Sequence, residues 1–414
     1  MELYFPVVLD GANGTELQKR GYDGSVCAEK WVLEHPEVMQ ELQQGYIDAG
    51  SRVIYAPTFG ANRAKLEENG ICGQTAQYNR DLVKISRELA DHANETRDPS
   101  ERVLVAGDIA TSGKFLAPLG DVSFDELYEM YLEQVSAMEE AGVDLYVIET
   151  IMTVPDARAA LLAVRDVSDK PVLVSFTCDE NGRTLTGSDV KAACVIMQGM
   201  GIEAFGLNCS TGPKEMLEQI KRVSEAAEVP LAAKPNAGLP KTMDGRVVYD
   251  CPPDEFAGYT KAFADEGVVL FGGCCGTGTE HIAAVSRALG DIRFEKKQPL
   301  MNDSLICATE KDMFFIERGT EIETIISCGP DLEEEIAKAN RNDDAVMAIE
   351  IRSEADIENF EVAQYAIRKP LCIVCDDRQL LDRALRLYQG RALYAGSLSE
   401  EELAPLVKKY GMQI

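Results

Sequence analysis

The sequence predicts an α/β protein built as a (β/α)8 TIM barrel with a small C-terminal α/β domain. Short apolar runs rich in β-branched residues alternate with longer amphipathic stretches through about the first 290 residues. Eight such runs occur, which matches the rhythm and size of a barrel of eight parallel strands. No G-x-G-x-x-G motif follows a strand, so a doubly wound open sheet is only the second interpretation.

The predicted strands are nearly continuous apolar runs, as expected for parallel strands that are buried on both faces. Between them, amphipathic stretches such as 36–49 and 123–141 are typical of helices, and Gly50 and Gly142 can end these two helices. The eight strands are expected at 7–12, 52–57, 103–110, 145–150, 172–177, 204–209, 230–236 and 268–275.

A second, smaller unit follows the barrel. We expect the barrel at 1–293, a charged and proline-containing linker at 294–304, and the small α/β domain at 305–414. The last part is too short for a second barrel. It is expected to contain strands at 345–351 and 371–375 and helices at 331–339, 378–388 and 399–410.

Composition excludes several classes of partner. The formal net charge of −29 leaves no positive field for nucleic acid or an anionic membrane surface. No uncharged apolar run reaches the length of about 18 residues that a transmembrane helix needs, and the N-terminus lacks the basic region of a signal peptide. We therefore expect a cytoplasmic protein with no nucleic-acid or membrane partner, and a homodimer is among the states that the sequence allows.

Polar, thiol and glycine residues stand where the predicted strands end. The carboxyl ends of barrel strands carry the active sites of TIM-barrel enzymes, so these side chains are expected to share one site. They include Asp10, Glu149, Cys209, Asn236, Cys274 and Cys275.

Three cysteines in this set can form a metal site. Cys209, Cys274 and Cys275 can offer zinc three thiolates and leave its fourth position open, which is typical of a catalytic rather than a structural site. Soft thiolates favour zinc over magnesium or calcium, and the glycines around Cys274 and Cys275 tolerate the tight turn required. From spacing alone, buried structural thiols and a vicinal disulfide stay open as alternatives.

Five segments together carry a family resemblance: LDGANGTE at 9–16, TFGANR at 58–63, GLNCS at 206–210, PNAG at 235–238 and FGGCCGT at 271–277. In this order they resemble the homocysteine S-methyltransferase family, and within it the N-terminal homocysteine-binding barrel of cobalamin-dependent methionine synthase. The resemblance covers about residues 5–290. One departure is Tyr55-Ala56-Pro57, where many relatives have Glu-Thr-Asn. It bears on the preference for homocysteine over another thiol.

The resemblance implies a zinc-dependent S-methyltransferase that transfers a methyl group to the thiol of homocysteine and forms methionine. Its metal ligands and catalytic centre would be Cys209, Cys274 and Cys275. The resemblance further places Asp10 and Glu149 around the amino group of homocysteine. The backbone N–H groups of Gly11 and Ala12 are candidates for its carboxylate, and Asn236 for the open zinc position when substrate is absent.

The C-terminal residues 370–376 and 383–391 resemble the last part of the folate-binding barrel of methionine synthase. The segment is too short for a folate site, and no D-x-H-x-x-G cobalamin motif occurs. We expect one zinc ion per chain and neither cobalamin nor folate bound by the chain itself. The likeness favours a methylcobalamin (corrinoid) protein in trans as methyl donor. S-methylmethionine, S-adenosylmethionine and a betaine stay open, as does a non-catalytic zinc- or thiol-binding sensor or assembly module.

Overall fold

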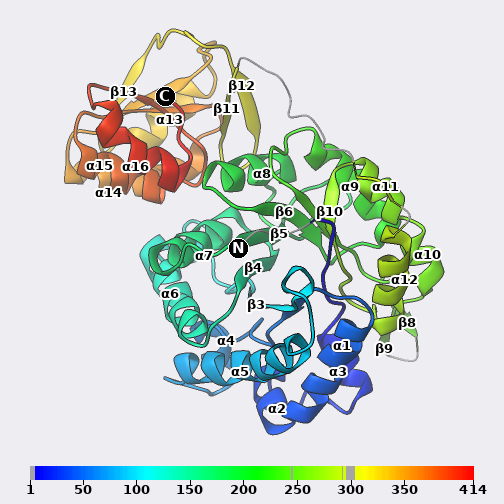
Figure 1. The fold of residues 1–414 in the computed structure, drawn as a ribbon. Coiled ribbons are helices and arrows are strands. Elements are labelled where there is room, and N and C mark those ends of the chain that lie inside the picture. The colour runs from blue at the N-terminus through cyan, green and yellow to red at the C-terminus, as the bar shows by residue number, and fades with distance from the viewer. Residues whose placement is uncertain (1–4, 244–245, 291, 295–303) are drawn as a thin grey trace.

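The computed structural model describes residues 5–243, 246–290, 292–294 and 304–414 (Figure 1). Most of the predicted linker, at 295–303, lies outside these residues. Eight parallel strands form one sheet in the order β1-β10-β7-β6-β5-β4-β3-β2. The N–H of Arg52, next to β2, donates to Val8 O of β1 (2.7 Å) and brings the two ends of the sheet together. The predicted TIM barrel is therefore confirmed. Its strands are β1 (Val7–Val8), β2 (Val53–Tyr55), β3 (Leu104–Ile109), β4 (Leu145–Ile151), β5 (Val172–Phe176), β6 (Ala204–Asn208), β7 (Leu231–Lys234) and β10 (Val268–Phe271).

Alternate residues along each strand face two different cores, as in other closed parallel barrels. In β4, Leu145 and Val147 belong to the cluster that fills the barrel, whereas Tyr146 and Ile148 pack in the cluster between strands and helices. Both cores consist of buried aliphatic and aromatic side chains. This rigid scaffold fixes where each strand ends, and the strand ends carry the candidate site.

Helices surround the barrel, and local sequence signals set their ends. Helix α6 (Phe124–Glu140) begins after Ser123, which forms a capping box with Glu126. Gly142 follows the end of this helix with a φ of +84°. Within the described ranges, no helix is both long and apolar enough to cross a membrane. The helices are α1 (Gly14–Lys19), α2 (Ala28–Glu34), α3 (Pro36–Asp48), α4 (Arg63–Glu68), α5 (Thr75–Asn94), α6 (Phe124–Glu140), α7 (Val154–Val167), α8 (Val190–Gly199), α9 (Pro213–Ser224), α10 (Pro253–Ala257), α11 (Thr260–Asp265) and α12 (Thr279–Leu289), with a 3-10 turn at Pro99–Glu101.

The C-terminal residues form a separate lobe beside α7 and α8 (Figure 1). An antiparallel hairpin of β11 (Leu305–Ala308) and β12 (Met313–Ile316) precedes a four-stranded parallel sheet in the order β13-β14-β15-β16. Sequence analysis predicted β14 and β15 and three of the helices but missed β11, β12, β13, β16 and α14. The remaining elements are β13 (Ile325–Ser327), β14 (Met347–Glu350), β15 (Leu371–Val374), β16 (Leu393–Ala395), α13 (Leu332–Ala339), α14 (Glu354–Ala363), α15 (Arg378–Leu387), α16 (Glu400–Tyr410) and a 3-10 turn at Gln364–Ala366.

A buried arginine ties this lobe to the barrel. Arg158 of α7 is fully buried, and its guanidinium donates to Leu385 O (2.8 Å), Gly390 O (3.3 Å) and Arg386 O (3.4 Å). Burial lowers the pKa of Arg158 to about 10, which still leaves the side chain charged at neutral pH. The arginine therefore supplies donors to carbonyl groups at the end of α15 that would otherwise be buried without a partner.

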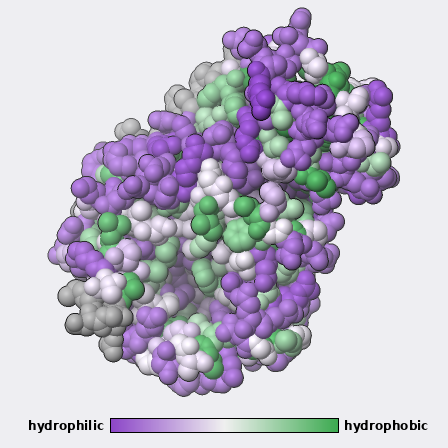
Figure 2. Space-filling view, turned by 180° about the vertical axis from the view of Figure 1, so that it is seen from behind, coloured by the Kyte–Doolittle hydropathy of each residue, from purple (hydrophilic) through white to green (hydrophobic). Residues whose placement is uncertain are grey.

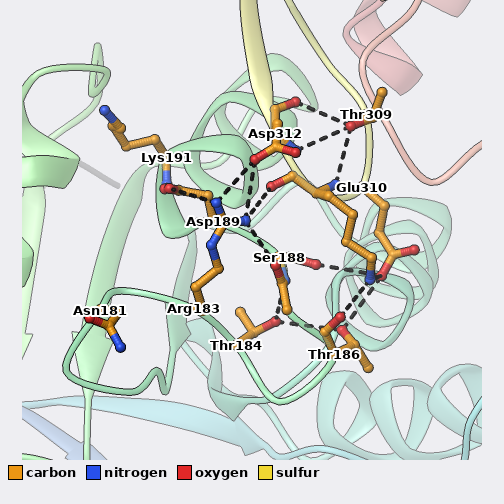
Figure 3. A network of polar contacts seen from close by, with 12 residues as sticks. Asn181, Arg183, Thr184, Thr186, Ser188, Asp189, Lys191, Thr309, Glu310 and Asp312 are labelled. Carbon is orange, nitrogen blue, oxygen red and sulfur yellow. Dashed lines mark hydrogen bonds and ion pairs between the residues drawn. The ribbon is translucent and has the colours of Figure 1, made fainter. Parts of the chain in front are cut away.

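A second contact joins the lobe to a loop at the carboxyl end of the barrel (Figure 3). Arg183, in the loop between β5 and α8, pairs with Asp312 at the turn of the β11–β12 hairpin (3.2 Å). Lys311 Nζ donates to Thr186 O (2.8 Å), and the N–H of Asp189 donates to Lys311 O (2.9 Å). The hairpin thus holds the middle and the C-terminal end of the loop that follows β5.

We expect Arg158→Met to loosen the lobe, because the carbonyls at residues 385–390 lose a buried donor. One unpaired buried carbonyl costs about 1–3 kcal/mol, and amide hydrogen exchange should quicken at 385–391. Arg165→Met is the matched control on the same helix, because Arg165 bonds only to Lys170, Gly201 and Glu203 of the barrel. Unchanged exchange at 385–391 in Arg158→Met would contradict the role given to this residue.

Candidate functional site

The three cysteines predicted as metal ligands lie together. Cys209 follows β6, and Cys274 and Cys275 follow β10, its neighbour across β7. Their sulfur atoms all lie within 4.8 Å of one another, and Cys209 Sγ is 3.9 Å from Cys275 Sγ. All three are free thiols, so no vicinal disulfide forms. Among the described residues, no other set of Cys, His, Asp or Glu side chains meets the same criterion for sharing a metal ion.

The backbone around these thiols is strained. Within the described part of the chain, three non-glycine residues have a positive φ: Thr150 (54°), Cys209 (62°) and Ser210 (59°). All three follow or end a strand on this side of the barrel. Such conformations cost of order 1–3 kcal/mol each and cluster at functional sites, so this local geometry supports a functional centre.

Asn208 organises the strand ends next to the thiols. Its Oδ1 accepts hydrogen bonds from the Ser175 hydroxyl (2.7 Å) and the N–H of Thr150 (2.9 Å). Its Nδ2 donates to Thr150 Oγ1 (2.7 Å) and lies 4.0 Å from Cys274 Sγ. One buried amide therefore fixes the ends of β4 and β6 against the cysteine cluster.

The loops after β7 and β10 are joined by backbone hydrogen bonds. The N–H of Cys274 donates to Pro235 O (2.8 Å), and the N–H of Ala237 donates to Cys275 O (2.9 Å). Asn236 stands between these two contacts and is buried, and its Oδ1 has no hydrogen-bond partner among the described residues. The backbone at Asn236 is thus held against the turn that carries Cys274 and Cys275, and its amide oxygen is left unpaired within the described part of the chain.

The thiols share their protons unequally. Hydrogen bonds with the Cys209 and Cys274 thiols lower the pKa of Cys275 to about 3. By contrast, the hydrogen bonds that Cys274 makes with Cys209 and Cys275 raise the pKa of Cys274 well above the ordinary value. Tyr249 packs over this turn: burial and the Cys275 side chain raise its pKa, and a Cβ at Gly276 would meet its ring at 2.4 Å. A negatively charged sulfur group of this kind suits a cation.

A cavity of about 250 Å³ adjoins the three sulfur atoms. Seen from behind, the barrel is hollowed near its centre and apolar side chains border the hollow (Figure 2). Gly11 lines the cavity, and a Cβ there would lie 2.7 Å from the Tyr46 ring. Ala12 also lines it, but its N–H donates to Thr277 Oγ1 (3.2 Å). Its other walls include Tyr55, Phe59, Asp108, Glu149, Thr150 and Lys234.

The two predicted substrate carboxylates surround a buried lysine. Lys234, at the end of β7, lies with its Nζ 2.9 Å from Asp10 Oδ1, 3.4 Å from Glu149 Oε2 and 3.5 Å from the centre of the Tyr55 ring. Burial alone would lower the pKa of Lys234, but Asp10 and Glu149 hold it well above the ordinary value. Glu149 lines the cavity and Asp10 does not, because Asp10 is fully buried between Lys234 and the N–H of Tyr55 (2.9 Å).

Three residues of this site were missed by the sequence analysis as site residues: Lys234, Asp108 and Tyr249. Lys234 and Asp108 were detectable, because a charged side chain at or near the end of an apolar barrel strand is a signal of function. Tyr249 reaches the site from the segment that follows the β8 (Lys241–Met243) and β9 (Arg246–Val248) hairpin, and no pattern in the sequence places it there.

Together the fold and the site define a (β/α)8-barrel protein with a three-thiol centre beside an acidic cavity at the carboxyl ends of its strands. The sequence profile of the family described as homocysteine S-methyltransferase matches residues 7–289, more than half of the chain. The protein therefore belongs to the homocysteine S-methyltransferase family, a family of methyltransferase enzymes.

Two similar proteins are mycobacterial methionine synthases. That of Mycobacterium tuberculosis (strain ATCC 25618 / H37Rv) is 32% identical over 306 residues, which cover 70% of this chain and 25% of the relative. That of Mycobacterium leprae (strain TN) is 32% identical over 297 residues, which cover 68% and 24%. The chain thus spans about a quarter of the length of these relatives.

Solved structures share the fold. The metallated form of the homocysteine methyltransferase MmuM from Escherichia coli is 23% identical, with a TM-score of 0.58 over 68% of this chain and 95% of that chain. The oxidized form gives 21% and 0.57 with the same coverage. At this identity the likeness concerns the barrel alone.

Proposed function

We propose that the protein is a zinc-dependent S-methyltransferase that transfers a methyl group to the thiol of homocysteine and forms methionine. One observation carries the proposal: three free thiols within 4.8 Å of one another adjoin a small cavity with acidic side chains in its wall. A thiol-binding metal and an amine-binding wall at this spacing suit a small amino acid that carries a thiol.

The donor set fits zinc. Cys209, Cys274 and Cys275 are soft ligands, and three protein ligands leave a fourth position for a substrate atom. A bound zinc ion would stabilise the substrate sulfur as a thiolate, the nucleophilic form, at a pH where a free thiol is mostly protonated. We expect one zinc ion per chain, with Asn236 Oδ1 as the group that approaches the open position without substrate.

The chain's own residues would orient the amino acid. Glu149 supplies negative charge in the cavity wall for the ammonium group, and Asp10 acts next to it through its pair with Lys234. The backbone at Gly11 and Ala12 faces the cavity and is proposed to receive the carboxylate. The Ala12 N–H would then exchange its bond to Thr277 for the ligand.

We propose a methylcobalamin (corrinoid) protein in trans as the methyl donor, with neither cobalamin nor folate held by this chain. The 32% identity to a methionine synthase and the likeness of residues 370–376 and 383–391 to its folate-binding barrel support this donor. We further propose a cytoplasmic location. The lobe at 305–414 is proposed as a packing or docking element, and a homodimer is one arrangement that would use it.

The second candidate function is a non-catalytic zinc- or thiol-binding sensor or assembly module. Zinc content does not separate it from an enzyme. Turnover does: the zinc-loaded protein is offered homocysteine with a methylated corrinoid protein, S-methylmethionine, S-adenosylmethionine or a betaine. Formation of methionine with one donor supports the enzyme, and binding of homocysteine without turnover with any donor supports the sensor.

Homocysteine binding is expected to release close to one proton per site near neutral pH. The reason is that the free thiol, with a pKa near 8.5, is mostly protonated, whereas the bound sulfur is a thiolate. Titration calorimetry in buffers of different ionisation enthalpy measures the number of protons released.

The control for this measurement is L-methionine, whose sulfur carries no proton, so any heat that depends on the buffer must come from other groups. A binding enthalpy for homocysteine that does not depend on the buffer below the pKa of the thiol would show that the sulfur is not bound as a thiolate.

A further inference from the structure

A buried lysine inside a proposed amine-binding wall needs an explanation. Lys234 is 4% exposed and its ammonium already contacts Asp10 and Glu149, the two carboxylates expected to receive the substrate's ammonium group. Burying a charge is unfavourable unless it is paired, so Lys234 is expected to keep its ion pairs in the folded barrel. The lysine therefore decides which carboxyl groups remain available to a ligand.

Asp10 is engaged by the protein and closed off from the cavity. Its Oδ1 accepts from Lys234 and its Oδ2 from the N–H of Tyr55, and none of its surface is exposed. It does not line the cavity beside the thiols. Lys234, which does line the cavity, pairs with Asp10 from the cavity side.

Asp108 differs from Asp10 because it lines the cavity and, in the part of the chain that the structure describes, has an unpaired carboxyl oxygen. It lies near the end of β3, where Thr58 fixes its backbone through two hydrogen bonds (3.1 and 2.8 Å). Its side chain is 2% exposed and lines the same cavity as Glu149, and its Oδ1 is buried without a hydrogen-bond partner among the described residues. A buried carboxyl oxygen without a donor is unfavourable, and an ammonium group in the cavity would supply one.

The charges of the cavity lining also favour a cationic ligand. Glu29, Asp108 and Glu149 line it, and Lys234 is the one cationic side chain among its described lining residues. Glu29 is already used, because its Oε1 accepts the N–H of Gly60 (2.8 Å). Burial and the charge of Glu149 raise the pKa of Asp108 well above the ordinary value, although Lys234 acts to lower it.

We propose that Asp108 is a further substrate-binding residue, which together with Glu149 contacts the ammonium group of the amino-acid thiol, while Lys234 neutralises Asp10 and keeps it out of the cavity. This inference rests on the proposed function. It adds a determinant of specificity: the site selects thiols that carry an amino group, because an ammonium group supplies both positive charge and hydrogen-bond donors to the two carboxyl groups.

The test compares two thiols on the zinc-loaded protein by titration calorimetry. One is L-homocysteine, and the other is 4-mercaptobutanoate, which is homocysteine without its amino group. Asp108→Asn is expected to weaken homocysteine binding by about 10- to 100-fold, the effect of one hydrogen bond to a charged group. Binding of 4-mercaptobutanoate should stay the same or tighten, because this ligand has no ammonium group to lose.

Glu29→Gln is the matched control. It also removes a carboxylate from the cavity wall, but Glu29 already accepts a hydrogen bond from the N–H of Gly60. It should not change the ratio of the two affinities. The zinc content and melting temperature of Asp108→Asn should equal or exceed those of the parent, which excludes unfolding as the cause of weaker binding.

Two results would overturn the inference. If Asp108→Asn binds both thiols like the parent, Asp108 has no contact with the ligand and water satisfies its oxygen. If it weakens both thiols equally, Asp108 only shapes the cavity. Failure of the proposed function looks different, because the zinc-loaded parent would then bind neither thiol.

Discussion

Replacing Cys274 by serine is expected to lower the affinity for zinc by more than about 100-fold, since loss of a mere outer-shell partner already costs 10–100-fold. A hydroxyl is a poor ligand for a soft metal, and Cys274 is one of only three thiols in the cluster. Competition with a chelator and metal analysis by mass spectrometry measure the loss without any assay of activity.

Cys251→Ser is the control for this variant, because Cys251 is another half-buried free thiol at this end of the barrel but lies outside the cluster. It should keep the full zinc content. Full retention of zinc in the triple serine variant of Cys209, Cys274 and Cys275 would remove the basis of the metal site.

Replacing Lys234 by methionine should destabilise the barrel by about 3–5 kcal/mol, the typical cost of breaking a buried ion pair. Asp10 and Glu149 would remain buried without their shared cation. Urea unfolding at neutral pH measures the change. The double variant Lys234→Met with Asp10→Asn should recover part of the loss, because one of the two unpaired charges is then gone.

The pH dependence of Lys234→Met has a definite sign. Burial already raises the pKa of Asp10 and of Glu149, and loss of Lys234 removes the group that lowers both. The folded variant then binds protons that the unfolded chain releases, so its stability should rise as the pH falls and the penalty should vanish below about pH 4.

Lys241→Met is the control for Lys234→Met, because Lys241 pairs with Asp250 on the surface, where both side chains are more than half exposed. It should cost at most about 1 kcal/mol. An equal, small cost at both positions would show that the buried pair does not stabilise the barrel.

The barrel was predictable from the sequence because its strands are buried on both faces and therefore form nearly continuous apolar runs. Runs such as 103–110 and 145–150 lie within two residues of β3 and β4 at each end. The C-terminal lobe was harder to predict. Its edge strand β13 has only three residues, of which Ile325 is exposed, so no apolar pattern marks it.

The thiol cluster was predictable for a related reason. Cys209 and Cys274 stand at the ends of two predicted strands that are separated by one strand, and the closure of a parallel barrel brings such ends to one rim. The pairing of Lys234 with Asp10 was not predictable, because it depends on which way a side chain turns at a strand end. The sequence placed Asp10, Glu149 and Lys234 at strand ends but did not show that the lysine would lie between the two carboxylates.

The contact between the β11–β12 hairpin and the loop after β5 constrains how the sequence can change in evolution. That loop also reaches the thiol centre: Asp179 O accepts from Gln219, Thr211 donates to Gln219, and the N–H of Thr211 donates to Cys209 O (2.6 Å). Arg183 and Asp312 are thus linked to Cys209 through the loop after β5 and through Gln219 of α9. Substitutions in the hairpin would shift the position of Cys209. The hairpin and the loop after β5 are therefore expected to covary among related sequences, and the C-terminal lobe constrains the evolution of the thiol site in the barrel.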